Sequence, residues 1–416
     1  MRIAVIGTGI SGLTAAWLLH RRHELVVYEA DDRVGGHTHT VDACSGGRSW
    51  AVDTGFVVFN DRTYPNLLKI FGRLGVASQP STMAFSVHCE RTGLEYRPSS
   101  LGTLFTQRRN LFRWPFWRML WDIRRFSRQS LELLGEEPRE TLGQYLRRRR
   151  YSRGFIEHFI VPMGAAIWSA EPVGFEAFPA ALFARFFANH GFLRVRGQPQ
   201  WRVVAGGSRE YLKPLTGGFA GRIRTSCPVR ELRRRGGAVD VTDAAGRTER
   251  FDEVVLAVHS DQALAMLADP TADEREVLGA IAYQDNHVDL HTDTTLLPNR
   301  RAAWASWNYR IPAEPLGRVA VTYNMNMLQS LDAPETFCVT LNQADRIAPG
   351  RKLFSTTYAH PVYTPSAAAA QKRHGEISGV RRTHYCGAYW GYGFHEDGVN
   401  SALAVGRHFG LGIDDA

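Results

Sequence analysis

The chain has 416 residues and a mass of 46.6 kDa, so we expect two or three folding units. Apolar residues make up 44% and charged residues 22%, which excludes a disordered or collagen-like chain. The net charge of +9 points to acidic partners, such as nucleic acid, anionic lipid or a phosphate-bearing cofactor.

The cysteines and the apolar segments indicate the cellular compartment and whether a signal peptide or a membrane span is expected. The five cysteines are odd in number, widely spaced and without a CxxC pair, so they indicate neither a disulfide framework nor a zinc site and fit a reducing, cytoplasmic compartment. The apolar stretch Ile3–Leu19 contains regularly spaced glycines and no cleavage site, so we expect it to belong to the fold rather than to a signal peptide. No apolar run approaches the roughly 20 residues that span a bilayer.

The first thirty residues predict a strand, turn, helix and strand. Residues Arg2–Ile6 form an apolar strand, Gly7–Gly12 a glycine-rich turn, Leu13–Arg22 a helix and Glu24–Glu29 a second strand. The first glycine of the GxGxxG pattern permits the tight turn, the second lets backbone N–H groups approach a diphosphate, and the third allows close helix packing. Glu29 at the end of the second strand can bind the adenosine ribose. This order predicts a dinucleotide site.

In the middle of the chain the sequence pattern changes from strands to helices. Residues Ser99–Arg153 predict helices separated by a polar break at Gly135–Arg139, and Phe155–Asn189 predicts further helices. Strand patterns return at Val203–Val204, Val229–Leu232, Ala238–Val241 and Phe251–Val258, and again between Asp285 and Asn342; Gly391–Phe409 ends in a helical pattern. We therefore expect a nucleotide domain in separate pieces, with helical and β insertions between them.

The residues after Glu29 resemble a known family. The run EADDRVGGHTHT (residues 29–40) is similar to the ExxxRxGGR motif of the flavin-containing amine oxidase and phytoene desaturase superfamily, with His37 in place of the second arginine. Five other segments are similar to that superfamily: Val52–Asn60, Val203–Leu212, Cys227–Val229, Val254–Val258 and Tyr385–Ala402. The last of these resembles the final flavin motif, in which a strand with a glycine, here Gly387, leads into a helix pointing at the flavin.

The resemblance implies an α/β fold: a discontinuous Rossmann-like FAD-binding domain with an inserted α+β substrate domain. The FAD-binding domain would comprise residues 1–75, 200–270 and 375–416, and the substrate domain 76–199 and 271–374, with a helical, membrane-facing part at 105–153. FAD is the implied cofactor. The implied cofactor-binding residues are Gly7, Gly9, Ser11, Gly12, Glu29, Ala30, Arg33, Gly35, Gly36, His37, Thr38, Gly55, Phe56, Val57, Val229, Gly387, His395, Glu396 and Val399. Since no second GxGxxG follows a strand, electrons would pass to oxygen, a quinone or a carrier protein.

Two substrate classes remain open. Within the superfamily the segments GGHTHTVD, HTDTTLLPNRRAAWASWNYR, VTYNMNMLQ and GYGFHEDG most resemble a bacterial group. Some of its members are linked to cyclopropane, methyl-branched or furan fatty-acid modification. This implies an oxidoreductase that oxidises or desaturates a modified fatty-acyl chain of phospholipid. The alternative is an amine oxidase that releases peroxide. Such an enzyme often has a lysine near the flavin, but this chain has only four lysines, none in a recognised motif. A non-catalytic flavoprotein is a third class.

The candidate catalytic residues and the candidate membrane contact follow from these alternatives. His395 is a candidate base by its motif position, as are His291 and Asp293, and Tyr309 and Asn326 are expected to shape the pocket. Aromatic residues are available for the pocket: Trp304, Trp307, Tyr309, Trp390 and Tyr392. The segment Arg108–Arg128 alternates aromatic residues with arginines, which is typical of a helix in an anionic membrane interface or of a helix that covers a core. A flavin motif at each end argues against nucleic-acid binding.

Overall fold

The computed structural model describes residues 1–135, 140–193, 197–314 and 316–416. Its N-terminal segment folds into β1 (Arg2–Ile6), α1 (Ile10–Leu19) and β2 (Glu24–Tyr28). The apolar stretch Ile3–Leu19 is thus part of the fold, as expected. The helix starts earlier than predicted because Gly9, with φ −64° and ψ 175°, is extended and serves as its N-cap.

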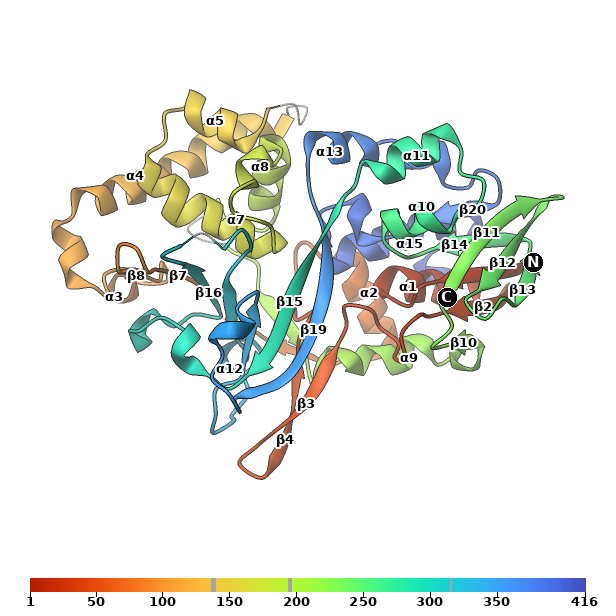
Figure 1. Cartoon of the computed structure of the whole chain (residues 1–416), viewed down its shortest axis with the longest axis horizontal. Helices are drawn as coiled ribbons and strands as arrows, with labels where there is room; N and C mark the ends of the chain where they lie inside the picture. Colours follow the sequence, from red (N-terminus) through yellow and green to blue (C-terminus); the bar gives the residue numbers. More distant parts are fainter. Residues whose placement is uncertain (136–139, 194–196, 315) are drawn as a thin grey trace.

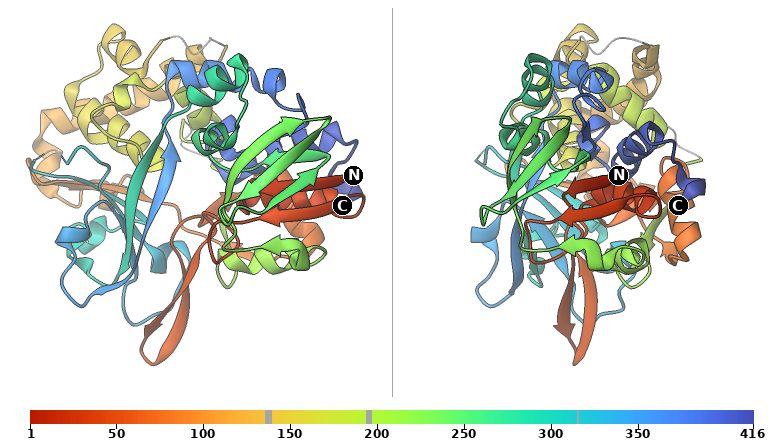
Figure 2. Two further views of the ribbon diagram at one scale, coloured as in Figure 1. Left: turned by 45° about the vertical axis from the view of Figure 1, so that its right-hand side comes forward. Right: turned by 90° about the vertical axis from the view of Figure 1, so that its right-hand side faces the viewer.

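The nucleotide part is a parallel sheet with the strand order β10-β2-β1-β14-β20. The other three strands are β10 (Ile223–Arg224), β14 (Glu253–Leu256) and β20 (Thr383–Tyr385). Side chains alternate between its faces: Ile3 and Val5 pack towards α1, α2 (Pro65–Leu74) and α15 (His395–His408), whereas Ala4 and Ile6 pack towards an antiparallel meander. The meander comprises β11 (Val229–Arg235), β12 (Ala238–Asp243) and β13 (Thr248–Phe251). Figures 1 and 2 show these layers near the two termini.

The strand predicted over Phe251–Val258 is two elements. β13 ends at Phe251 and pairs with β12, and β14 begins at Glu253 and pairs with β1. The chain changes sheet at Asp252, whose carboxylate accepts a hydrogen bond of 2.7 Å from the backbone N–H of Arg2. A single apolar run in the sequence does not reveal this change of partner.

A second, seven-stranded sheet has the order β19-β15-β18-β17-β16-β7-β8. Its strands are β7 (Phe85–Cys89), β8 (Leu94–Tyr96), β15 (Tyr283–His291), β16 (Trp307–Ile311), β17 (Val321–Asn324), β18 (Cys338–Leu341) and β19 (Lys352–Pro361). All neighbours in it are antiparallel except β16 and β7. The long pair β15 and β19 extends towards the nucleotide part in Figure 1.

Helices form the third part of the molecule. They include α4 (Trp114–Gln129), α5 (Leu142–Arg148), α7 (Val161–Trp168) and α8 (Ala180–Asn189), which share one hydrophobic core with the seven-stranded sheet. The predicted polar break at Gly135–Arg139 lies, beyond Gly135 itself, outside the described residues. Among the described residues, no helix is both long and apolar enough to cross a membrane.

The remaining strands are β3 (Thr40–Ser45), β4 (Arg48–Asp53), β5 (Val58–Asn60), β6 (Ser78–Pro80) and β9 (Trp201–Val204). The remaining helices are α3 (Leu101–Leu104), α6 (Arg153–Phe155), α9 (Leu212–Thr216), α10 (Ser260–Met266), α11 (Ala272–Gly279), α12 (Met325–Leu328), α13 (Pro365–Gln371) and α14 (His374–Ile377).

Candidate functional site

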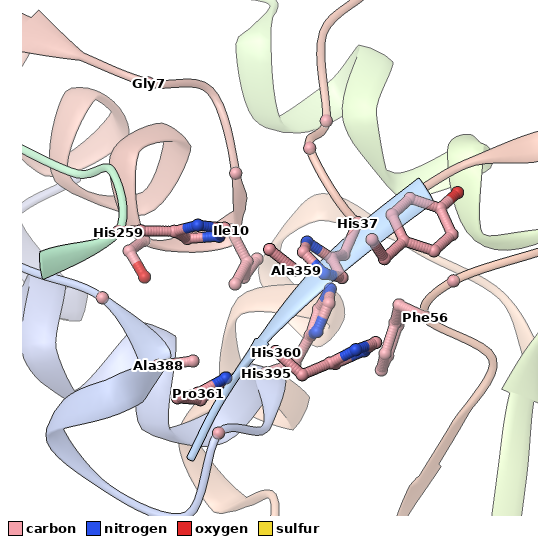
Figure 3. Close-up of a pocket in the computed structure, with 18 of the residues that line it drawn as sticks. Gly7, Ile10, His37, Phe56, His259, Ala359, His360, Pro361, Ala388 and His395 are labelled. Carbon is pink, nitrogen blue, oxygen red and sulfur yellow. The ribbon is translucent and has the colours of Figure 1, made fainter. Parts of the chain in front are cut away.

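A cavity of about 790 Å³ lies between the parallel sheet and the seven-stranded sheet. Fifteen predicted cofactor-binding residues line it: Gly7, Gly9, Ser11, Glu29, Ala30, Arg33, Gly35, Gly36, His37, Gly55, Phe56, Val57, Val229, Gly387 and His395. Figure 3 shows one region of the cavity, with Gly7 and Ile10 on one side and Ala388 and Pro361 on another. The structure therefore gathers segments from the whole length of the chain around one space.

The three glycines of the turn have different surroundings. A Cβ on Gly7, whose φ is +100°, would lie 2.6 Å from the carbonyl oxygen of Ala257, and one on Gly12 would lie 2.0 Å from that of Gly7. Both positions are closed by backbone. A Cβ on Gly9 would meet nothing within 4 Å. Gly9 thus leaves free the space directly at the N-terminus of α1, where backbone N–H groups and the helix dipole favour an anion.

Glu29 joins the second strand to the glycine turn. Its carboxylate accepts hydrogen bonds from the backbone N–H groups of Thr8 and Asp31, both at 2.9 Å, and a further one from the Thr8 hydroxyl. The side chain is 9% exposed and reaches the cavity. A carboxylate in this place can accept hydrogen bonds from a ribose.

The loop after Glu29 is held by its own arginine. The Arg33 guanidinium donates to the carbonyl oxygens of Gly36 at 2.8 Å and Thr38 at 3.2 Å. A Cβ on Gly36 would lie 3.1 Å from the Cα of Gly9, so this loop is packed against the glycine turn. The two segments that the resemblance assigns to diphosphate binding are therefore adjacent.

Three histidines gather at the cavity beside this loop. The ring centroid of His37 lies 5.4 Å from that of His360 and 6.2 Å from that of His259. Burial lowers the pKa of all three, that of His360 to about 4, so they are neutral at pH 7. His259 and His360 were not predicted. His259 directly follows the predicted strand Phe251–Val258, and its place at the carboxyl end of a parallel strand was the signal that could have identified it. His360 lies in a segment without a recognised motif.

Hydrogen bonds fix the tautomer of His360. The side-chain oxygen of Asn286 accepts from Asn342 Nδ2 at 2.8 Å, so its Nδ2 faces the carbonyl oxygen of Ser169 at 3.1 Å. The same Nδ2 lies 3.0 Å from His360 Nδ1 and donates to it. The proton of neutral His360 is therefore on Nε2, which makes this ring a hydrogen-bond donor rather than a base.

His395 is the one predicted catalytic residue that lines the cavity. It begins α15, and its ring stacks on Phe56 with centroids 3.5 Å apart. Its Nε2 lies 3.1 Å from Thr38 Oγ1 and 3.3 Å from the Tyr211 hydroxyl. Burial lowers its pKa to about 3, so the imidazole is neutral. Figure 3 shows His395 beside Phe56, with His360 close by.

Four predicted cofactor-binding residues do not line the cavity and instead support it. Gly12 packs on the glycine turn, and Thr38 holds His395 and Tyr211. Glu396 accepts hydrogen bonds from the backbone N–H groups of Asn66 at 3.0 Å and Leu67 at 2.9 Å, and so holds the start of α2. Val399 is buried in the core between α15 and the parallel sheet. The sequence motif identifies these residues but not which of them faces inwards.

The structure does not bring His291 and Asp293 to the cavity. Val288, Val339 and Leu341 of the seven-stranded sheet face the cavity. His291 instead bonds Thr340 Oγ1 at 2.7 Å, and that hydroxyl in turn bonds Thr322 Oγ1. Because side chains alternate along strands, these three polar residues lie away from the cavity wall.

Of the other residues predicted to act at the pocket, some line the cavity and others lie outside it. Asp293 caps a turn, accepting from the backbone N–H of Thr295 at 2.9 Å and of Ala348 at 2.8 Å. Tyr309 is buried in the hydrophobic core, outside the cavity lining, and Asn326 binds backbone groups of Glu335 and Phe337. Of the predicted aromatic residues, Trp307 and Tyr392 line the cavity, but Trp304 and Trp390 do not.

The part of the cavity beside the seven-stranded sheet is mainly apolar. Its apolar and aromatic residues are Val57, Val58, Ile167, Trp168, Val288, Trp307, Tyr323, Met325, Leu328, Val339, Leu341 and Tyr392. The polar residues Ser169, Asp285, Thr356, Thr357 and His360 line the end nearer the nucleotide part. All four lysines, Lys69, Lys213, Lys352 and Lys372, belong to the described residues and lie outside this lining. Asp53 reaches the cavity but is buried and already satisfied by Thr40, Ser208 and Gln329, and burial raises its pKa to about 6.

Comparison with known proteins agrees with this geometry. The model of the family described as flavin containing amine oxidoreductase matches residues 10–288. The chain belongs to this family. Two Mycobacterium tuberculosis proteins, both named "Putative flavin-containing monoamine oxidase AofH", are 27% identical over 289 residues, which is 64% of this chain and 59% of theirs. The chain thus aligns with less than two thirds of the length of these relatives.

Solved structures confirm the predicted fold class. A CLA-producing fatty acid isomerase from P. acnes superposes with a TM-score of 0.71 at 17% identity, covering 98% of both chains. Cyclohexylamine oxidase from Brevibacterium oxydans IH-35A superposes with a TM-score of 0.68 at 15% identity, covering 98% of this chain and 99% of the other. At these identities the likeness shows the fold alone.

The predicted family and its FAD cofactor are confirmed by the family match, and the residues present fit that group. Gly9 leaves open the space at the N-terminus of α1, Glu29 offers a carboxylate at the adjacent strand end, and the cavity continues from there to Phe56 and the start of α15. When bound, FAD supplies an acceptor for a hydride equivalent at N5 of its isoalloxazine ring.

Proposed function

We propose that this protein oxidises or desaturates a hydrophobic acyl chain, specifically a methyl-branched or cyclopropane fatty-acyl chain of phospholipid. The apolar wall of the cavity supports this proposal. Residues such as Ile167, Tyr323 and Leu341 offer aliphatic and aromatic surface to a chain of CH₂ groups. The substrate would lose a hydride from one carbon and a proton from its neighbour, leaving a double bond between them. The electrons would then go to oxygen, a quinone or a carrier protein.

His395 is the residue that we assign to proton removal. It is the only one of the predicted candidate bases that lies in the cavity lining. Thr38 and Tyr211, whose hydroxyl oxygens are 2.5 Å apart, lie at Nε2 and would accept a hydrogen bond from its proton, which leaves Nδ1 to take the proton of the substrate. These hydrogen bonds would stabilise the imidazolium, whose formation burial disfavours. His360, whose Nδ1 is occupied by Asn286, would donate from Nε2 to the substrate or the cofactor.

Oxidation of an amine is the second candidate. It is favoured by the family description and by the name of the curated relatives, and the rings of Trp168, Tyr323 and Tyr392 could enclose a neutral amine. Against it stand the absence of all four lysines from the cavity lining and the hydrogen bonds that already satisfy Asp53. The shared fold does not distinguish the two substrates, because a fatty acid isomerase and cyclohexylamine oxidase both have it.

Anaerobic loss of the visible flavin band distinguishes the two. The holoprotein is mixed in separate samples with a cyclopropane phospholipid, a methyl-branched phospholipid, an unmodified phospholipid and a set of simple amines. We expect bleaching by the modified lipids and none by the amines. Bleaching by amines alone would refute the acyl substrate and leave the cofactor site intact.

A further inference from the structure

The outer face of α4 exposes tryptophans, although its other face is part of the core. Phe116, Met119 and Phe126 are buried against the neighbouring helices. Trp114, Trp117 and Trp121 occur at helical spacing on the opposite face and are 75%, 43% and 53% exposed. One face of this helix therefore covers a core, as one of the two sequence-based alternatives expects, and the other face meets solvent.

The turn before α4 enlarges this surface. Over Arg108–Phe112 it exposes Leu111 and Phe112, which are 42% and 90% accessible, and Trp117 Nε1 donates to the Leu111 carbonyl at 2.8 Å. We call Leu111, Phe112, Trp114, Trp117 and Trp121 the tryptophan face. Of the phenylalanines, tryptophans and tyrosines that the structure describes, every exposed one lies in this face. Such concentration marks an interaction surface.

Arginines surround the tryptophan face. Arg108, Arg109, Arg113, Arg124 and Arg128 are exposed around it. Residues 101–135 hold seven arginines against two acidic residues, Asp122 and Glu132. Asp122 is buried and already bound by Arg118 and Arg125, whose guanidinium carbons lie 5.0 Å from the Trp121 ring centre. The surface thus combines large aromatic groups with an excess of positive charge.

We propose that the tryptophan face docks on an anionic phospholipid bilayer. Tryptophan rings suit the boundary between head groups and acyl chains, and arginines can bind lipid phosphates while their stems lie on apolar surface. An acidic protein would satisfy the charge equally well, but would not require that all the exposed aromatic rings of the described chain lie on one face. In Figure 1, α4 lies at the edge of the molecule away from the two termini.

This surface would bring the cavity close to its substrate and thus rests on the proposed acyl activity. The helical region that carries the tryptophan face shares its core with α7, whose residues Ile167 and Trp168 line the cavity. A docked helical region would place this wall near the bilayer. Membrane binding can be measured without turnover, so an experiment can refute the docking proposal and leave the proposed acyl activity standing, or the reverse.

Flotation of the FAD-loaded full chain with vesicles tests the proposal. Vesicles of phosphatidylcholine with phosphatidylglycerol are compared with vesicles of phosphatidylcholine alone, at low and high salt. We expect binding to the mixed vesicles only, weakened by salt, and a roughly tenfold loss of affinity in the double variant Trp114→Ser/Trp121→Ser. The charge variant Arg124→Glu/Arg128→Glu should lose binding as well.

Matched controls come from exposed residues elsewhere. Val173→Ser and Val380→Ser remove side chains that are 72% and 44% exposed, and Arg230→Glu reverses a distant exposed charge; none should change binding. The flavin band and the Tm confirm that each variant is folded. Failure of the parent protein to float with anionic vesicles, or full binding by the folded tryptophan variant, would overturn the proposal. A parent dimer that the tryptophan variant converts to monomers, without vesicle binding, would instead identify a self-association surface.

Discussion

The carboxylate of Glu29 accepts a hydrogen bond of 2.9 Å from the backbone N–H of Thr8, and so ties the end of β2 to the turn that follows β1. The same carboxylate faces the cavity. Glu29 thus has two tasks: it holds the glycine turn in shape, and it offers oxygen atoms to the ribose of a dinucleotide. Removal of this side chain should therefore weaken cofactor binding in two ways, by loosening the glycine turn and by removing the partner of the ribose.

Glu29→Ala should weaken FAD binding roughly 10- to 100-fold, because hydrogen bonds to a charged group contribute about 1.5–3 kcal/mol. Glu24→Ala is the matched control, since Glu24 begins the same strand but is exposed and outside the cavity. Flavin fluorescence during titration of the apoprotein measures both affinities. Equal affinities in the two variants would contradict a role of Glu29 in the site.

Gly9→Ala should reduce FAD affinity without harming the fold. The backbone of Gly9 has angles that any residue adopts, and the added methyl group would enter the open cavity. Gly12→Ala should instead destabilise the apoprotein by about 1–3 kcal/mol, because its methyl group would collide with the Gly7 carbonyl. Thermal unfolding of the two apoproteins and their FAD titrations should show opposite patterns. A Gly9→Ala protein that binds FAD normally would mean that the space beside Gly9 is not used.

His395→Gln should slow lipid-driven bleaching of the flavin by about 100-fold or more, the usual contribution of a general base. His291→Gln should leave the rate unchanged, since His291 lies outside the cavity and bonds Thr340. Stopped-flow absorbance measures both rates after the flavin content has been matched. A comparable loss in both variants would indicate a structural effect and remove His395 from the chemistry.

Asp397 should make the parent protein less stable as pH rises, and the variant Asp397→Asn should lack this effect. Its carboxylate accepts from the backbone N–H of Phe394 at 3.0 Å, and loss of solvation raises its pKa from 3.8 to about 7. Between these values the unfolded chain releases a proton that the folded chain keeps, so this group costs stability as pH rises. The free energy of unfolding of Asp397→Asn should therefore rise relative to that of the parent as pH increases from about 4 to 7, by up to about 4 kcal/mol at roughly 1.4 kcal/mol per pKa unit. Denaturant unfolding of the apoproteins at several pH values gives the difference; a constant difference would refute the shift.

The cofactor half of the site could be predicted because its signals are local. The spacing of Gly7, Gly9 and Gly12 and the position of Glu29 follow from the geometry of one strand, turn and helix, and the structure places them accordingly. The sequence motif does not tell in which direction each side chain points. Glu396 follows His395 directly, but it points to the start of α2, whereas His395 lines the cavity.

The substrate half depends on contacts between distant strands. His360 lies in β19, and its orientation is determined by Asn286 in β15, Asn342 after β18 and Ser169 after α7. No local pattern marks these residues. His291 is a titratable group in a recognisable segment, but its bond to Thr340 depends on the pairing of β15 with β18. Successive side chains of a strand point to opposite faces of the sheet, but the sequence does not show which of the two faces borders the cavity.

The parallel sheet has a consequence for biosynthesis. Its central strand β1 pairs with β2 soon after both are made, but its other neighbour, β14, ends at Leu256, and β20 and α15 follow only after residue 382. Contacts over such separations form slowly. A nascent chain therefore carries an unfinished nucleotide site while the helices and the seven-stranded sheet are being made, and FAD can be enclosed only after the segment around His395 has been synthesised. Supply of flavin to the cell should then influence how much of the newly made protein survives, because the last step of folding and the capture of the cofactor coincide.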